Sequence, residues 1–348
     1  MRGPRAPPLL ASATRLSEPQ ISHPDNVRSD YDPAVPTVSV VVPSFARAPS
    51  LVRCLEALTL QTLPRDAFEV IVCDDGSSRP LEPAIAGLAD RIALTVVRQR
   101  RSGPAAARNE GARRAKGRLL AFTDDDCVPA PDWLARIVAR SDASPGHLIG
   151  GAIENILPRD PYAMATQLIM SSVYDYFSRH PTDHRFFSTT NLAVPTEQFW
   201  QIEGFSTSFA RAAGEDYDFC ARWHEAGLPS VYAPDAVVGH AHGHSLRSFL
   251  AQHFGYGRAL LRVREGMARR QGRPRIQLED PTFYRQLLTY PLRQGYGVRG
   301  IGYAALVILA QAATAAGAAI ERMTTGDWER FRAASGERPS SKATSATR

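Results

Sequence analysis

The sequence predicts an α/β protein with a mostly parallel β-sheet, helices on both faces of that sheet, and a helical C-terminal appendage. Between residues 37 and 141, apolar runs rich in β-branched residues alternate four times with segments of helical periodicity. This alternation is typical of strand–helix–strand units joined by right-handed crossovers. Polar clusters follow the ends of several runs, and ligands of such sheets bind beyond the carboxyl ends of the strands.

The first strand is expected at residues 37–42, because this run is apolar and stops at Pro43, as a buried strand does when it reaches a loop. A helix should follow at 50–61, where apolar residues recur at spacings of three and four. The next elements are a strand at 68–73, a helix at 81–89, a strand at 92–97 and a helix at 104–116 that has Pro104 in its first turn. Asp74 and Asp75 come directly after the second strand, which places them at the same rim of the sheet as Pro43.

The run at 119–128 carries the densest polar cluster of the chain. An apolar segment ends in Asp124, Asp125 and Asp126, and a helix at 132–141 follows. Three adjacent carboxylates repel one another unless a positive group lies among them. Carboxylate oxygens suit Mg²⁺ or Mn²⁺, so we expect a divalent ion that holds a diphosphate. The alternative is an acidic turn without a ligand.

In the second half we expect a strand at 147–155, a helix at 163–179, a strand at 190–195, a helix at 197–202, a helix at 215–227 and short strands at 231–234 and 236–239. Asp216 begins a face of the helix at 215–227 that is otherwise apolar, whereas Glu215 projects to a neighbouring face. An inward carboxylate beside apolar residues tends to have a raised pKa, which suits a general base. The alternative is an aspartate that only stabilises the helix N-terminus.

Histidines at 240, 242 and 244 could hold Zn²⁺ from one face of a strand, but no further Cys or carboxylate lies beside them in the sequence. One imidazole on the ion at Asp126 is the favoured interpretation. A basic helix at 245–268 and a break at 274–281 follow. Residues 301–320 carry no charge and would span about 30 Å as a helix, enough for a bilayer core. A packed or interfacial helix is the equal alternative.

Composition excludes some classes of partner. The net charge of +6 comes almost wholly from arginine, since Lys116 and Lys342 are the only lysines. These arginines form no basic stripe interleaved with aromatics, so we expect anionic small molecules or a membrane surface as partners and no nucleic acid. The four cysteines lie far apart among apolar neighbours, which indicates a reducing compartment. No secretory signal is evident near the N-terminus, so a cytoplasmic location is expected.

The expected organisation is a flexible arm at 1–36, a catalytic domain at 37–257 divided into a nucleotide-binding half (37–145) and an acceptor half (146–257), a helical region at 258–334, and a disordered tail at 335–348.

The order of the motifs resembles the inverting glycosyltransferases of family 2, which have the GT-A fold. The matching stretches are residues 40–47, 61–62, 70–77, Gly103 with 107–111, 123–126, 214–216 and 238–240. Each motif alone is weak, but their order and spacing together are specific. The resemblance covers about residues 37–257, and it departs from the family at Ala46, where Asn is common.

The resemblance implies a role for each matching residue. Pro43, Arg47, Asp75 and Arg108 would line the nucleotide pocket, with Asp75 accepting a hydrogen bond from the base. Asp124 would contact ribose or sugar, and Asn191 sits where the family often contacts sugar. Asp126 would bind the metal, His240 would complete metal or diphosphate binding, and Asp216 would be the catalytic base.

The expected activity is therefore that of a metal-dependent hexosyltransferase. It would move a sugar with inversion from a nucleoside diphosphate sugar, most simply a uridine diphosphate sugar, to a hydroxyl of a cell-envelope or lipid-linked glycan. One alternative is a nucleotidyltransferase, which would need a Gly-rich basic loop after the first strand, where residues 43–47 stand instead. The other is a non-catalytic nucleotide-sugar-binding protein, which would not need Asp216.

Overall fold

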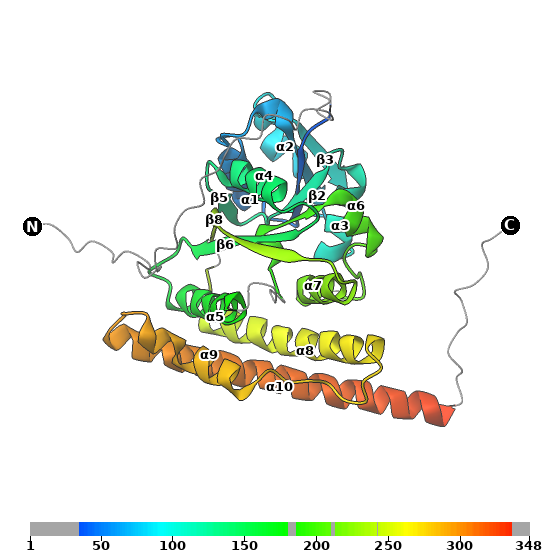
Figure 1. Cartoon of the computed structure of the whole chain (residues 1–348), viewed down its shortest axis with the longest axis vertical. Helices are drawn as coiled ribbons and strands as arrows, with labels where there is room; N and C mark the ends of the chain where they lie inside the picture. Colours follow the sequence, from blue (N-terminus) through cyan, green and yellow to red (C-terminus); the bar gives the residue numbers. More distant parts are fainter. Residues whose placement is uncertain (1–34, 180–185, 210–212, 242, 336–348) are drawn as a thin grey trace, which may run out of the picture. The chain divides into compact units, whose positions relative to one another are not determined.

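The computed structural model describes residues 35–179, 186–209, 213–241 and 243–335, without the side chains of Ser178 and of 325–335 (Figure 1). The flexible arm expected at 1–36 and the disordered tail expected at 335–348 lie outside this part of the chain, except for their innermost residues.

An eight-stranded mixed sheet runs through the structure in the order β3-β2-β1-β4-β7-β6-β8-β5. Its strands are β1 (Val38–Ser44), β2 (Phe68–Asp74), β3 (Leu94–Arg98), β4 (Leu119–Phe122), β5 (Cys127–Pro129), β6 (Leu148–Asn155), β7 (Leu192–Pro195) and β8 (Ser230–His240). Strands β1 to β4 are parallel to one another, as predicted. Strand β7 is antiparallel to both of its neighbours, and β5 is antiparallel to β8. The sequence analysis expected neither β5 nor a single continuous β8.

Helices cover both faces of the sheet because alternate residues of the buried strands point to opposite sides. On one face, Val40 and Val42 share a core with Leu51 of α1. On the other, Val41 shares a core with Trp223 of α7. The helices of the first face are α1 (Ala48–Leu58), α2 (Glu82–Ile85) and α4 (Trp133–Ala143); those of the second are α3 (Pro104–Arg114), α6 (Thr196–Gln201) and α7 (Glu215–Glu225).

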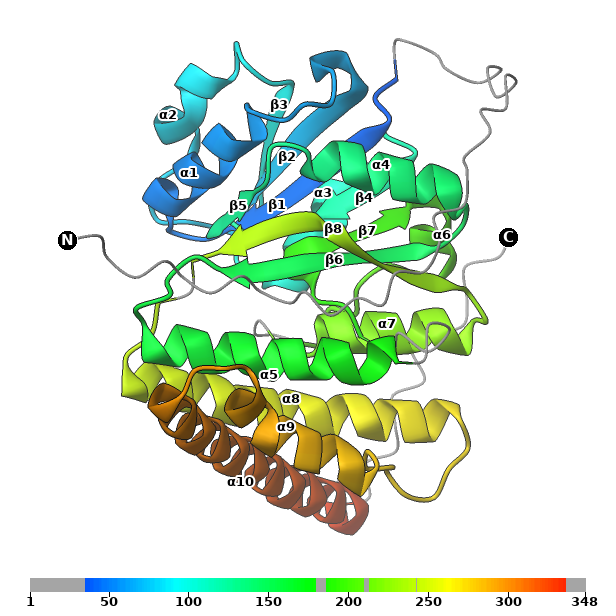
Figure 2. The same ribbon diagram turned by 60° about the vertical axis from the view of Figure 1, so that its left-hand side comes forward.

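A further layer of helices lies beside the sheet domain, on the side of α7 (Figures 1 and 2). It consists of α5 (Pro161–Ser178), α8 (Leu246–Arg270), α9 (Pro281–Arg293) and α10 (Val298–Ser335). Helix α9 was not expected. The predicted domain boundary after residue 257 falls inside α8, which continues through it. The predicted catalytic domain and the predicted C-terminal helical region are therefore not separated by a break in the helix.

Helix α10 contains the uncharged stretch at 301–320. Residues 298–324 are long and apolar enough to cross a membrane, with a mean hydropathy of 1.7. One face of the helix, with Ala304, Val307 and Ala310, is buried in the helical layer. The opposite face exposes Ile301 and Ile308. The helix is therefore packed along one side and presents an apolar surface on the other.

Two glycines allow α8 and α10 to approach closely. A Cβ atom on Gly257 would lie 1.8 Å from the carbonyl oxygen of Thr314, and one on Gly317 would lie 2.0 Å from that of Phe254. Both distances are far below van der Waals contact, so any side chain would force the helices apart. We expect these two glycines to set the contact between α8 and α10.

The substitution Gly257→Ala is therefore expected to lower the free energy of unfolding by about 1–3 kcal/mol, the usual cost of overpacking. Gly255→Ala is a matched control in the same helix, because a Cβ atom there meets nothing within 4 Å. The control should stabilise the protein by about 0.5–1 kcal/mol, since alanine is the better helix former. Urea titration of both variants measures the difference, and equal midpoints would contradict this account of the helix contact.

Candidate functional site

A cavity of about 1200 Å³ opens at the carboxyl ends of the parallel strands. The predicted site residues that line it are Pro43, Arg47, Asp75, Arg108, Asp124, Asp126, Asp216 and His240. Asp75 follows β2, Asp126 follows β4, and Asp216 lies in the first turn of α7. All three carboxylates therefore line one cavity.

Positive side chains of the protein itself lie among the three adjacent carboxylates. Arg47 contacts Asp126 at 2.8 Å and Asp125 at 3.3 Å, and Arg108 contacts Asp124 at 2.6 Å. Burial raises the pKa of Asp125 to about 6, although a hydrogen bond from Ser44 and the charge of Arg47 oppose the rise. The acidic cluster is thus partly neutralised by arginine, a source of positive charge that the sequence analysis did not consider.

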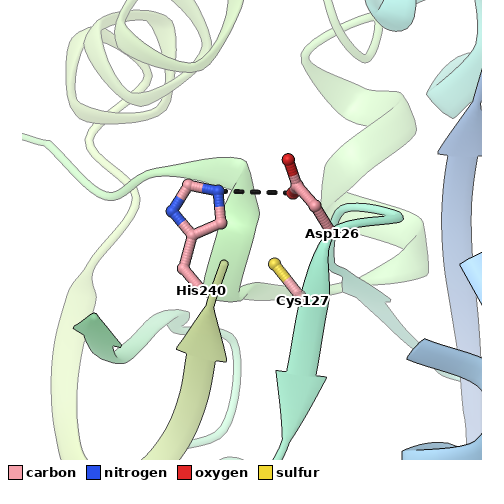
Figure 3. A group of neighbouring side chains, drawn as sticks. All are labelled: Asp126, Cys127 and His240. Atoms are coloured by element: carbon pink, nitrogen blue, oxygen red, sulfur yellow. Dashed lines mark ion pairs between the residues drawn. The ribbon is translucent and has the colours of Figure 1, made fainter. Parts of the chain in front are cut away.

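Asp126 and His240 form the group that best fits a metal ion. The His240 Nε2 atom lies 3.3 Å from Asp126 Oδ1, and Cys127 lies beside them (Figure 3). The pairing of β5 with β8 brings the group together, because Cys127 is directly opposite His240. Burial lowers the pKa of His240, but the hydrogen bond and charge of Asp126 outweigh it and the net shift is upward.

The donor atoms of this group suit a hard divalent ion. A carboxylate and an imidazole, with room for water and diphosphate oxygens, match Mg²⁺ or Mn²⁺. Burial raises the pKa of the Cys127 thiol well above its usual value, so the thiol stays protonated and is a poor ligand. For the zinc alternative, the backbone N–H of His244, the third histidine, donates a hydrogen bond to Asp160. Residue 242 is outside the described residues.

The start of α7 places Asp216 and Glu215 side by side with different environments. Glu215 is buried and its Oε1 accepts a hydrogen bond of 2.9 Å from Arg108, so it also faces inward. Asp216 is half-buried and lines the cavity, and its Oδ1 accepts a hydrogen bond from the backbone N–H of Tyr217. Burial, and then the negative charge of Glu215, raise the pKa of Asp216 to about 7. A carboxylate with this pKa is suited to general base catalysis near neutral pH.

Arg108 connects the acidic cluster to α7. Its guanidinium donates to Asp124 and to Glu215, residues that are far apart in the sequence. Thr190 donates to the other oxygen of Asp124 at 3.0 Å. Because both carboxylates accept from the same guanidinium, Arg108 holds them in position. Thr190 and Glu215 were missed as site residues; the Glu215-Asp216 pair was the available signal for the latter.

Asp75 organises the loop before α3. Its carboxylate accepts hydrogen bonds from Gln99 and from the backbone N–H groups of Ser102 and Gly103. A carboxylate has about four acceptor positions, so one remains for a ligand. The same loop places the Arg101 guanidinium 4.1 Å from the centre of the Phe45 ring, and both residues line the cavity. Arg101 is therefore a further cation of the site, beside Arg47 and Arg108, and it was not predicted from the sequence.

The prediction that Asn191 contacts sugar is wrong. Asn191 is fully buried, and the cavity is lined by its neighbours Thr189 and Thr190 instead. Its amide group donates to the backbone carbonyls of Ala152 and Ala236, and its carbonyl oxygen accepts from the indole N–H of Trp133. Through these three hydrogen bonds, the Asn191 side chain joins β6, β8 and α4. Sequence position alone could not separate this residue from Thr190 beside it, which lines the cavity.

Comparison with known proteins agrees with this arrangement. Residues 39–202 match the family model described as Glycosyl transferase family 2. Validoxylamine A glucosyltransferase of Streptomyces hygroscopicus subsp. jinggangensis is 30% identical over 230 residues, which are 58% of this chain and 54% of that protein. Glycosyltransferase AglE of Haloferax volcanii is 27% identical over 237 residues, which are 66% of this chain and 74% of that protein. The chain thus spans about half the length of the first of these relatives.

Two solved structures share the fold. A mannosyltransferase of Pyrobaculum calidifontis, in complex with GDP-Man and Mn²⁺, has a TM-score of 0.54 at 23% identity. The match covers 86% of this chain and 82% of the mannosyltransferase chain. GalNAc-T7 with UDP, GalNAc and Mn²⁺ has a TM-score of 0.51 at 20% identity, over 68% of this chain and 48% of its own. Together with the family model and the strand order, these similarities show that the chain has the GT-A fold and that its residues 39–202 are similar to glycosyl transferase family 2.

Proposed function

We propose that this protein is an inverting glycosyltransferase that moves a sugar from a nucleoside diphosphate sugar to an acceptor hydroxyl. The observation that carries the proposal is the position of Asp216. Its carboxylate, with a pKa raised to about 7, opens into the same cavity as Asp75 and the Asp126–His240 pair. A base, a nucleotide-binding rim and a cation site thus share one space.

In this mechanism Asp216 takes the proton of the acceptor hydroxyl as the hydroxyl oxygen attacks the anomeric carbon of the donor sugar. The new carbon–oxygen bond forms on the face opposite the diphosphate, while the bond from the anomeric carbon to the diphosphate oxygen breaks. The nucleoside diphosphate leaves with the bonding electrons, and the anomeric configuration is inverted. Mg²⁺ or Mn²⁺ held by Asp126 and His240 would offset the negative charge of the leaving group.

The remaining predicted residues would bind the donor. Asp75 has an acceptor position for an N–H group of the base, and Pro43 lies at the same rim. Arg47 is about half exposed and, with Arg101, offers positive charge to the diphosphate. Asp124, which keeps partial exposure beside Thr190, would accept from a sugar or ribose hydroxyl. A uridine diphosphate sugar is the proposed donor, by the family resemblance.

A panel of nucleotide sugars with Mn²⁺ or Mg²⁺ tests the proposal. A donor present at 100 times its dissociation constant should stabilise the folded protein by about 2.7 kcal/mol, seen as a rise in melting temperature. With the true donor, the protein should also release nucleoside diphosphate. Release of pyrophosphate would favour a nucleotidyltransferase, and binding without any release would favour a non-catalytic protein. If no nucleotide sugar shifts the melting temperature, the proposed function is wrong.

We further propose that the protein works at the cytoplasmic face of a membrane, on a cell-envelope or lipid-linked acceptor. Residues 246–322 contain twelve arginines and four acidic residues, a net charge of +8, compared with +6 for the whole chain. This basic region carries the exposed apolar face of α10, a combination that favours an interfacial position on anionic lipid. At low salt, the protein should float with anionic vesicles and not with neutral ones. If it floats with neither kind of vesicle, the proposal is wrong.

The raised pKa of Asp216 predicts the pH dependence of transfer. The base must be deprotonated to accept a proton, so kcat/KM should be constant above about pH 8 and should fall below pH 7, approaching tenfold per unit. Because burial and the charge of Glu215 raise the pKa of Asp216, this fall occurs at a higher pH than an ordinary aspartate would give. Initial rates at saturating Mn²⁺ between pH 6 and 9 measure it. A flat profile down to pH 6 would show that Asp216 does not titrate in this range.

A further inference from the structure

The cavity continues beyond the carboxylates into a space between α5, α8 and α9, which we term the helical limb. It is lined by Ile169, Met170, Val173, Leu260, Phe283 and Leu287. The whole cavity, at about 1200 Å³, is larger than the roughly 300–1,000 Å³ typical of a site for one small ligand. It therefore has room for a second ligand beside a nucleotide sugar.

The walls of the helical limb favour an apolar occupant. Met170 and Val173 stand on one face of α5, and Leu260 faces the same space from α8. Apolar side chains that border open volume lack the contacts that a close-packed interior provides. Gln311 and Thr314, the polar interruptions of the apolar stretch in α10, also line this cavity, which explains their presence in that helix.

Some buried polar atoms in the helical limb lack partners. Within the described part of the chain, neither Nε2 of His253 nor Oγ1 of Thr166 has a hydrogen-bond partner. His253 is 3% exposed, and burial lowers its pKa to about 4, so its ring is neutral at pH 7. Unpaired buried polar atoms are costly, and a hydroxyl group can pair with either one because it donates and accepts.

The helical limb carries no net charge. Among the described residues that line it, the charged ones are Arg264 and Glu279, which pair with each other at 3.4 Å. A phosphate or carboxylate would meet one cation there, Arg264, whose charge Glu279 already offsets. The occupant that fits is therefore neutral.

The helical limb opens next to Asp216. Tyr256 of α8 lines the cavity, and its ring centroid is 5.5 Å from that of His253. A Cβ atom on Gly214, two residues before Asp216, would lie 3.0 Å from the Cβ atom of Ala259, so the start of α7 lies against the helix that carries Leu260. A ligand in the helical limb can thus present its head to Asp216.

We propose that the helical limb is the acceptor site and that it takes a neutral amphiphile, a hydroxyl-bearing head with an aliphatic body. The inference rests on the proposed function, because the hydroxyl of the head is the group that Asp216 would deprotonate. It adds the chemical class of the acceptor: the aliphatic body lies among Met170, Val173 and Leu260, and a hydroxyl pairs with Thr166 or His253.

Titration calorimetry with n-alkyl β-glucosides of six to nine carbons, kept below their micelle concentrations, tests the proposal without any nucleotide. Affinity should rise by about fourfold for each added methylene until the limb is filled. It should change little between low and high salt, since the ligand is neutral. Glucose alone should bind at least tenfold more weakly than the hexyl glucoside. Affinity that does not depend on chain length would overturn the proposal.

Two leucines of α8 provide a matched pair of variants. Leu260 lines the helical limb, whereas Leu246 is 45% exposed in the first turn of the same helix. Leu260→Trp should weaken octyl glucoside at least tenfold by filling the limb, and Leu246→Trp should leave its affinity unchanged. Thr166→Val, which keeps the shape of the side chain and removes the hydroxyl, should weaken it by roughly two- to tenfold.

Nucleotide-sugar binding in the same variants separates the two proposals. Melting-temperature shifts with the donor should be retained by Leu260→Trp, which also shows that this variant is folded. Equal octyl glucoside affinity for Leu260→Trp and the unmodified protein would overturn the acceptor site while leaving donor transfer intact. Failure of every donor to bind the unmodified protein would instead overturn the proposed function, and the glucoside titration would still decide the chemistry of the limb.

Discussion

Replacing Asp216 with Asn is expected to lower kcat for sugar transfer by a factor of about 10²–10⁴, the usual contribution of a positioned general base. Asn keeps the shape of the side chain but cannot accept the proton of the acceptor hydroxyl. Because Asp75 and the Asp126–His240 pair are unchanged, the melting-temperature shift with the donor should be retained. Single-turnover rates with saturating donor measure the loss at the chemical step.

Two controls make this result specific to Asp216. Asp142→Asn changes an exposed carboxylate that pairs with Arg118 on the surface, and it should have no effect on transfer. Glu215→Gln removes the charge that raises the pKa of Asp216, so it should move the acid limb of the pH profile downward and keep measurable turnover. Normal turnover by Asp216→Asn would remove this residue from the mechanism.

Removal of divalent metal with excess EDTA is expected to abolish transfer, and Mn²⁺ or Mg²⁺ should restore it. The physical reason is the charge on the departing nucleoside diphosphate, which the Asp126–His240 group would help to offset through a bound ion. Direct titration of Mn²⁺, followed by electron spin resonance, measures binding apart from activity. It should show one site that is strengthened by the nucleoside diphosphate.

Variants at the two ligands localise that site. Loss of a group that merely orients a ligand costs about 10–100-fold in metal affinity, so Asp126→Asn and His240→Ala should each cost at least tenfold. His147→Ala is the matched control, because its ring lies beside the backbone of Pro145 and outside the metal group. Full activity in excess EDTA would show that the Asp126–His240 pair is not a metal site.

Much of the site was predictable because its residues follow strands directly. Asp75 and Asp126 come next to apolar runs whose parallel order is encoded by alternation with helices, so their meeting at one rim follows from local pattern. The inward position of Asp216 likewise follows from helical periodicity. The strand at Cys127–Pro129 was not predicted because it is too short to show a periodic pattern. The helix at Pro281–Arg293 was not predicted because it contains an internal proline.

By itself, the sequence determined most of the strand and helix order, the rim that carries the carboxylates, and the family resemblance, because each depends on neighbours within a few residues. Only the tertiary structure decided that Arg108 links Asp124 to Glu215 and that the Asn191 side chain makes three internal hydrogen bonds. It also decided that four helices enclose an apolar limb of the cavity. These contacts join residues far apart in the chain, and the pairing of distant segments depends on how sheet and helices pack together, which local periodicity does not encode.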